Sequence, residues 1–106
     1  MDIIVDANIL IAALIKDSHT RKFLMFSNHT FYTSEFVFEE IKNHIPELEE
    51  KTKVDKERLI EILREIIHLA NIQIIPSKEF ENNMPQAKKI SPDKDDIQYF
   101  ALALKK

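Results

Sequence analysis

Short apolar runs alternate with amphipathic segments along the whole chain. Residues 2–6 form a brief β-branched run that predicts a buried strand, and residues 30–33 and 72–75 predict two more. Helices are predicted between and after these strands, over 9–16, 18–27, 35–44, 55–70, from Ser77 to a break near Pro85, and from Ser91 or Asp93 to Leu104. Strands that alternate with helices indicate an α/β fold, here a three-layer α/β/α arrangement with a short parallel sheet.

Residues 55–70 carry the clearest helical pattern, because their apolar side chains recur on one face from Leu59 to Ala70. The charged segment 46–52 begins with Pro46, so we expect a connection between two helices there. The chain contains no glycine, and its helices must therefore end without the usual glycine cap.

The length of 106 residues predicts a single domain over 1–106, short for an α/β domain of about 120–150 residues. No apolar run reaches the ~18 residues that span a bilayer, so no membrane association is expected. Asp2 and Asp6 interrupt the apolar N-terminal region and argue against a secretory signal. The absence of cysteine suits a reducing compartment, and we expect a cytoplasmic protein.

Composition also excludes several classes of site. Without glycine, the chain cannot form the glycine-rich phosphate loops of P-loop or dinucleotide-binding proteins. Without cysteine, it has no thiolate nucleophile and no zinc–thiolate site. The formal net charge of −3 does not indicate a strongly basic nucleic-acid binder.

Acidic residues stand at three points where the predicted fold can gather them. Asp6 ends the first strand, directly before a helix, where open α/β folds place their chemistry, and Asn8 could orient its carboxylate or cap the helix. On the helix after the second strand, Glu40 lies at the boundary of the apolar face, while Glu39 points further out. Taken alone, each acid has an ordinary explanation as a helix cap or a solvated side chain.

Asp93, Asp95 and Asp96 open the last predicted helix. One aspartate there is explained by capping and by the helix dipole, but three in four residues exceed that need. Asp93 and Asp96 share a helix face, and Asp96 adjoins the apolar Ile97. If these acids converge with Asp6, their mutual repulsion requires a divalent cation.

Four segments together resemble a PIN domain, in particular the archaeal and bacterial stand-alone PIN proteins related to toxin ribonucleases. They are Val5-Asp6-Ala7-Asn8-Ile9-Leu10, Glu39-Glu40-Ile41, Ser91-Pro92-Asp93-Lys94-Asp95-Asp96 and Tyr99-Phe100-Ala101-Leu102-Ala103-Leu104. Each motif is short, but their order and spacing are specific in combination, and the resemblance covers essentially the whole chain.

The resemblance implies a metal-dependent endoribonuclease. Asp6, Glu40 and Asp96 match the family's catalytic acids, which with Asp93 would bind Mg²⁺ or Mn²⁺, and Asn8 matches a polar residue that supports the first acid. The bound metal would lower the pKa of a water molecule for in-line attack on phosphorus. RNA is the implied substrate, and a homodimer and an antitoxin-like protein are the implied partners.

The family pattern usually continues after this last helix into a further strand, a Thr or Ser and a fourth acid. These have no counterpart up to Lys106, so we expect a C-terminally short PIN-like fold, either truncated or naturally shortened. A non-catalytic PIN-like module that binds RNA or protein is the first alternative. The second is a domain that uses Asp6 as a phosphoacceptor, against which Asn8 counts because such phosphatases place an acid there.

Overall fold

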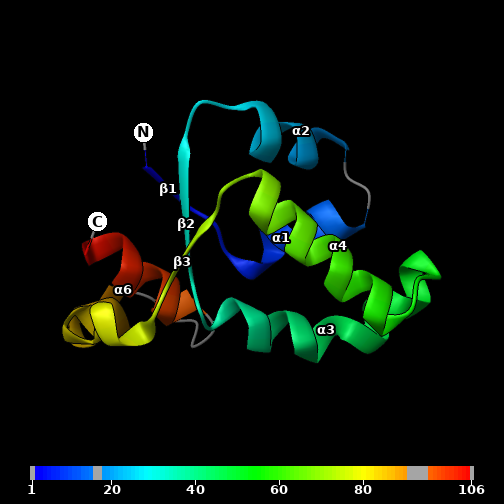
Figure 1. Ribbon diagram of the computed structural model, residues 1–106. Coiled ribbons are helices and arrows are strands. Elements are labelled where there is room, and N and C mark those ends of the chain that lie inside the picture. The colour runs from blue at the N-terminus through cyan, green and yellow to red at the C-terminus, as the bar shows by residue number, and fades with distance from the viewer. Residues whose placement is uncertain (1, 16–17, 91–95, 106) are drawn as a thin grey trace.

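Three parallel strands form the centre of the computed structural model, which describes residues 2–15, 18–90 and 96–105 (Figure 1). The strands are β1 (Asp2–Ile4), β2 (Thr30–Ser34) and β3 (Gln73–Ile75), in the order β1-β2-β3. Ile3 lies opposite Phe31, and Thr33 opposite Ile74. The Val5 N–H donates to the Tyr32 carbonyl at 2.7 Å, which carries the β1 pairing one residue further.

Helices cover both faces of this sheet, as Figure 1 shows, with α1 to α4 on one side and α6 on the other. Their bounds are α1 (Ala7–Leu14), α2 (Ser18–Phe26), α3 (Val37–Thr52), α4 (Lys56–Leu69), α5 (Met84–Ile90) and α6 (Ile97–Lys105). The α/β class with a parallel sheet between two helical layers is therefore confirmed. Within the described ranges, no helix is long and apolar enough to cross a membrane.

The two faces of the sheet build two separate cores, because successive side chains of a strand point to opposite faces. Ile3 and Phe31 pack on the side of α1 to α4, where most of the buried apolar residues lie. Ile4 and Tyr32, one residue further along each strand, pack on the side of α5 and α6. That second core is small and centres on Phe80 and Leu102.

Helix α3 corrects the expected break at Pro46, because it continues through this residue to Thr52. The segment predicted as a connection is thus the second half of a helix. A proline inside a helix costs about 3 kcal/mol through the lost hydrogen bond and the ring clash. Ile45 and Leu48, on either side of Pro46, are buried in the larger core, and their burial offsets that cost.

The segment after β3 also differs from expectation. Two short 3₁₀ turns, Ser77–Glu79 and Glu81–Asn83, replace the helix expected from Ser77. Pro85 lies at the second position of α5 and does not break it. Proline is tolerated there, since the first N–H groups of a helix have no partner within the helix. The caps predicted at Ser91 and Asp93 lie outside the described residues.

Without glycine, other residues take the left-handed conformation at two helix ends. Lys53 ends α3 with φ 58°, and Asn71 follows α4 with φ 52°. Asparagine adopts this region more readily than most residues, whereas lysine has a Cβ that makes it costly. Between these helices, the Asp55 carboxylate accepts a hydrogen bond from the Arg58 N–H at 2.9 Å and caps the start of α4.

Candidate functional site

Asp6 is held at the carboxyl edge of the sheet by the start of helix α1. It follows β1 directly and is the N-cap of α1, where its Oδ1 accepts a hydrogen bond from the Ile9 N–H at 3.1 Å. This bond fixes one carboxylate oxygen against the helix backbone. The side chain is only half-buried, so the carboxylate is both positioned and accessible.

Glu40 reaches the same edge from the first turn of helix α3. The chain turns sharply after β2, where the buried Ser34 hydroxyl accepts a hydrogen bond from the Phe36 N–H at 3.1 Å. Glu39 is exposed, whereas Glu40 is half-buried and its Oε1 atom is fully buried. The predicted difference in orientation between these two neighbours is therefore confirmed.

The hydroxyl of Tyr99, on α6, joins the two acids. Its oxygen is buried near the Glu40 carboxylate, the charge of Asp6 and the backbone N–H of Ala7. Burial of the ring, which is 7% exposed, raises the pKa of Tyr99 far above its usual value of 10.0, and the two carboxylates add to the effect. Tyr99 is therefore a neutral hydrogen-bond donor at the point where α1, α3 and α6 meet.

Asp96 lies half-buried immediately before α6, three residues ahead of Tyr99 and hence on the same side of that helix. Its two neighbouring candidates, Asp93 and Asp95, lie outside the described residues. In the part of the chain that the structure describes, no three or more histidine or acidic side chains are close enough together to hold a metal ion. The structure thus places the carboxylates of Asp6 and Glu40 near Tyr99, and the role of Asp96 as a third ligand stays a prediction.

A pocket of about 480 Å³ opens beside Asp6, between the outer edge of β1 and the helices α1 and α2. Asn8, His19 and Thr20 supply polar groups to its wall, and Phe23 supplies an aromatic ring. Asn8 is exposed on the first turn of α1. The acidic edge therefore has open space next to it, large enough for part of a polymeric substrate.

The sequence interpretation did not identify Tyr99 as part of the site. Its position three residues after Asp96 was a usable signal, since that spacing places both on one side of the helix. The oxygen atoms of Asp6 and Glu40 are hard ligands of the kind that Mg²⁺ and Mn²⁺ prefer. Two such groups from distant segments, both near one buried hydroxyl, could supply part of the ligand set of a divalent cation.

Comparison with known proteins identifies a family for this chain. A family model described as the PIN domain matches residues 4–106, nearly the whole chain. No curated protein and no solved structure shows significant similarity to it. Because the family model spans more than half of the sequence and the fold has the α/β architecture expected of it, the chain belongs to the PIN domain family.

Proposed function

We propose that this protein is a Mg²⁺- or Mn²⁺-dependent ribonuclease that hydrolyses phosphodiester bonds within RNA. PIN domains are typically ribonucleases, and membership of the family supports the reaction class. The observation that carries the proposal for this chain is the meeting of Glu40 and Asp6 at the Tyr99 hydroxyl. A metal-dependent nuclease needs carboxylates from separate elements near one point, and Asp6 and Glu40 meet that condition in part.

Asp6 and Glu40 are the residues proposed to hold the cation, with Asp96 and Asp93 completing the set from the start of α6. When bound, such an ion supplies activation of water and neutralisation of the charge that develops on the phosphate oxygens. Asp6 can serve because α1 fixes one of its oxygens, and the side chain remains accessible. Asn8 is proposed to support the Asp6 end of the site from the first turn of α1.

Tyr99 is proposed to position Glu40. Its hydroxyl stays protonated, since its pKa is raised by burial and by the two acids, so it can donate a hydrogen bond to the nearby carboxylate. Such a bond would restrict the rotamers of Glu40 and leave the carboxylate's other lone pairs for a ligand. The pocket beside Asp6 is proposed to receive the nucleotide next to the scissile bond.

A second candidate is a PIN module that binds a partner without cleaving RNA. An apolar groove with basic residues along its margins lies between α3 and α4, away from Asp6, and favours a binding role. Cleavage and binding are separable by assay, because only cleavage requires the carboxylates of Asp6 and Glu40.

The test compares Glu40→Gln with Glu39→Gln, a neighbouring and exposed glutamate that serves as the matched control. Purified protein is incubated with labelled single-stranded RNA in Mg²⁺, in Mn²⁺ or in EDTA. Glu40→Gln and Asp6→Asn are expected to lower the metal-dependent cleavage rate by roughly 10²-fold or more, and Glu39→Gln to leave it unchanged. Asparagine caps helices as well as aspartate does, so Asp6→Asn keeps α1 intact.

Thermal unfolding gives a second readout that does not depend on activity. Mn²⁺ at about 100 times its dissociation constant stabilises the folded state by about 2.7 kcal/mol. The wild type and Glu39→Gln should show this shift, and Glu40→Gln should lose most of it. RNA that is bound but never cleaved, together with an absent Mn²⁺ shift, would favour the binding module instead.

A further inference from the structure

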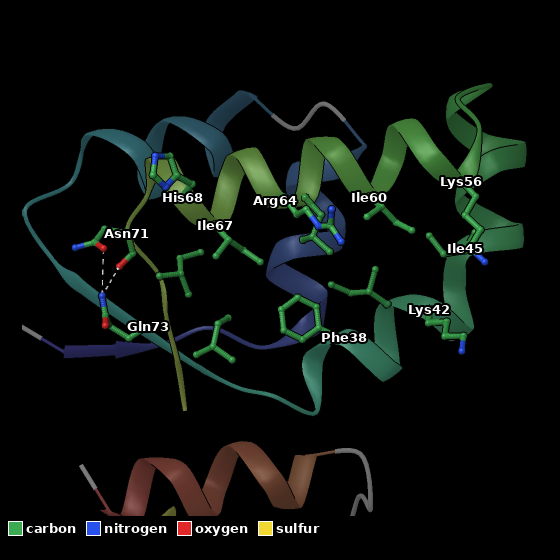
Figure 2. Close-up of a pocket in the computed structure, with 14 residues that line it drawn as sticks. Phe38, Lys42, Ile45, Lys56, Ile60, Arg64, Ile67, His68, Asn71 and Gln73 are labelled. Carbon is green, nitrogen blue, oxygen red and sulfur yellow. Dashed lines mark hydrogen bonds between the residues drawn. The ribbon is translucent and has the colours of Figure 1, made fainter. Parts of the chain in front are cut away.

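A groove of about 810 Å³ runs between α3 and α4 and ends beside β3, on the side of the sheet away from α6 (Figure 2). Figure 2 shows Ile60, Arg64 and Ile67 projecting from α4 toward α3. The floor is apolar, since buried Ile41 and Leu63 form its base and half-buried Ile60 and Ile67 form its sides. This space holds none of the acids proposed for catalysis.

Basic side chains surround this apolar floor. Lys42, Lys56 and Arg64 are exposed and line the groove, and no described aspartate or glutamate lines it with them. Within the described residues, none of these three cations forms an ion pair. The groove is therefore locally positive, although the protein carries a net charge of −3.

Basic residues of α3 and α4 that lie outside the groove form ion pairs. On the same two helices, Lys51 lies 3.9 Å from the carboxylate of Glu47, and Arg58 lies 2.9 Å from that of Glu61. On α3 and α4, the basic residues outside the groove thus form ion pairs with carboxylates, whereas within the described residues those along the groove do not. Charge complementarity calls for an acidic occupant.

The dimensions and chemistry of the floor indicate which acidic occupant fits. From Lys56 to His68 the groove follows twelve residue steps of α4, or about 18 Å, which matches roughly three turns of a helix. Proteins that bind single-stranded nucleic acid use several aromatic side chains on which the bases stack, whereas Phe38 is the only Phe, Tyr or Trp among the described residues that line the groove. Branched aliphatic side chains instead suit the apolar face of an amphipathic helix.

We propose that the α3–α4 groove docks an amphipathic helical segment of another protein. The apolar face of that segment fills the groove, and its acidic side chains pair with Lys42, Lys56 and Arg64. This site goes beyond the proposed nuclease activity and does not depend on it, because Asp6 and Glu40 do not line the groove.

The experiment screens a displayed library of random helical peptides against the whole protein. Selected peptides are expected to carry apolar residues at i, i+3, i+4 and i+7 and a net negative charge. Their affinities are then measured by fluorescence anisotropy at low and at high salt. Binding should weaken as salt rises, because exposed charge pairs are screened.

Two matched double variants locate the binding. Lys42→Ala with Arg64→Ala removes one groove cation from each helix, and Lys51→Ala with Arg58→Ala removes one cation from each helix outside the groove. Both variants change the net charge equally. The groove variant should bind the selected peptides about tenfold more weakly, and the control variant should bind them within about twofold of wild type. Ile60→Glu, at a half-buried position, tests the apolar floor in the same way.

Several results would overturn the proposal. Selected peptides that are basic or lack an apolar face would do so, as would equal loss in the two double variants. Tight binding of labelled single-stranded RNA that Lys42→Ala with Arg64→Ala alone abolishes would assign the groove to RNA. Concentration-dependent self-association that Ile60→Glu abolishes would assign it to a second copy of the chain. The cleavage assay rests on Asp6 and Glu40, which do not line the groove, so failure here and failure of the nuclease are distinguishable.

Discussion

The two helical layers differ greatly in the size of the apolar core between each of them and the sheet. On the side of α1 to α4, fifteen buried apolar residues of the described chain form one cluster. On the side of α5 and α6, four do so, and two of these are alanines. We call the layer of α1 to α4 the thick layer and that of α5 and α6 the thin layer. The thick layer supplies most of the hydrophobic stabilisation, since that stabilisation follows the buried apolar area.

The candidate site lies across this boundary. Asp6 and Glu40 belong to α1 and α3 in the thick layer, whereas Tyr99 and Asp96 belong to the thin one. The approach of the Tyr99 hydroxyl to Glu40 thus joins the layer with the larger apolar core to the layer with the smaller one. The position of α6, and with it that of Asp96, depends on this smaller core, so the geometry of the site is more easily disturbed from the α6 side.

The largest expected effect comes from truncating one fully buried leucine in each layer. Leu10→Ala in the thick layer and Leu102→Ala in the thin layer each leave a cavity, and such changes cost about 2–5 kcal/mol. We expect Leu10→Ala to lower the free energy of global unfolding, measured in urea, by the upper part of that range. Leu102→Ala should instead increase hydrogen exchange mainly in α5 and α6.

These two leucines form a matched pair, since both are 0% exposed in the wild type. Equal losses of global stability, with protection lowered uniformly along the chain in both variants, would show that the layers unfold as one unit. The contrast between a thick and a thin layer would then have no energetic meaning.

A smaller effect is expected from the tyrosine at the boundary between the layers. The pKa of Tyr99 is raised by burial and by Glu40 and Asp6, whereas the unfolded chain keeps the ordinary value of 10.0. The contribution of Tyr99 is therefore fully present below about pH 10 and is lost as the pH rises further. The loss amounts to about 1.4 kcal/mol per pH unit, because only the unfolded state releases the proton.

Urea unfolding in EDTA, repeated from about pH 8 to 11, checks this prediction. The wild type should lose stability above pH 10 more steeply than Tyr99→Phe, which has no proton to release at that position. At pH 8 the variant should already be about 1–3 kcal/mol less stable if the Tyr99 hydroxyl donates to the neighbouring Glu40 carboxylate, because the buried acid then loses its donor. Parallel curves for the two proteins would mean that Tyr99 ionises as freely in the folded state as in the unfolded one.

The smallest effect concerns only the thick layer. Lys53 ends α3 in the left-handed conformation, which costs a residue with a Cβ about 1 kcal/mol or more. Glycine removes this cost, but its greater freedom in the unfolded chain offsets part of the gain. Lys53→Gly should therefore stabilise the protein by about 0.5–1 kcal/mol. Lys51→Gly, two residues earlier within the helix, is the control and should destabilise by about 1 kcal/mol.

Lys53→Gly also sharpens the comparison between the layers. If α6 opens locally, a gain in global stability should leave its hydrogen exchange unchanged. Slower exchange throughout α6 in this variant would instead show that opening of the thin layer requires unfolding of the thick one.

Much of the fold was predictable because its signals are local. The short β-branched runs specified three strands, and the periodic apolar face from Leu59 onward specified α4 with its Asp55 cap. The position of Asp6 between strand and helix, and that of Glu40 beside Ile41, specified where each carboxylate would lie relative to the apolar face. The motifs were also sufficient to identify the family, as the match over residues 4–106 confirms.

Other features depend on partners that are distant in the sequence. Pro46 predicts a helix end by itself, but burial of Ile45 and Leu48 against the thick core carries α3 through it. Tyr99 is an ordinary aromatic residue until α6 packs on the sheet and places its hydroxyl against Glu40. The metal-ligand roles predicted for Asp6, Glu40, Asp93 and Asp96 stay predictions.

The groove between α3 and α4 likewise combines features that the local sequence determines with features that depend on tertiary packing. The sequence determines that Lys42 and Arg64 occupy helices with apolar faces, because propensity and periodicity act over a few neighbouring residues. Only the packing of the two helices decides that these cations surround a common apolar floor. Side-chain periodicity specifies which residues are to be buried, whereas the three-dimensional arrangement decides which residues they meet.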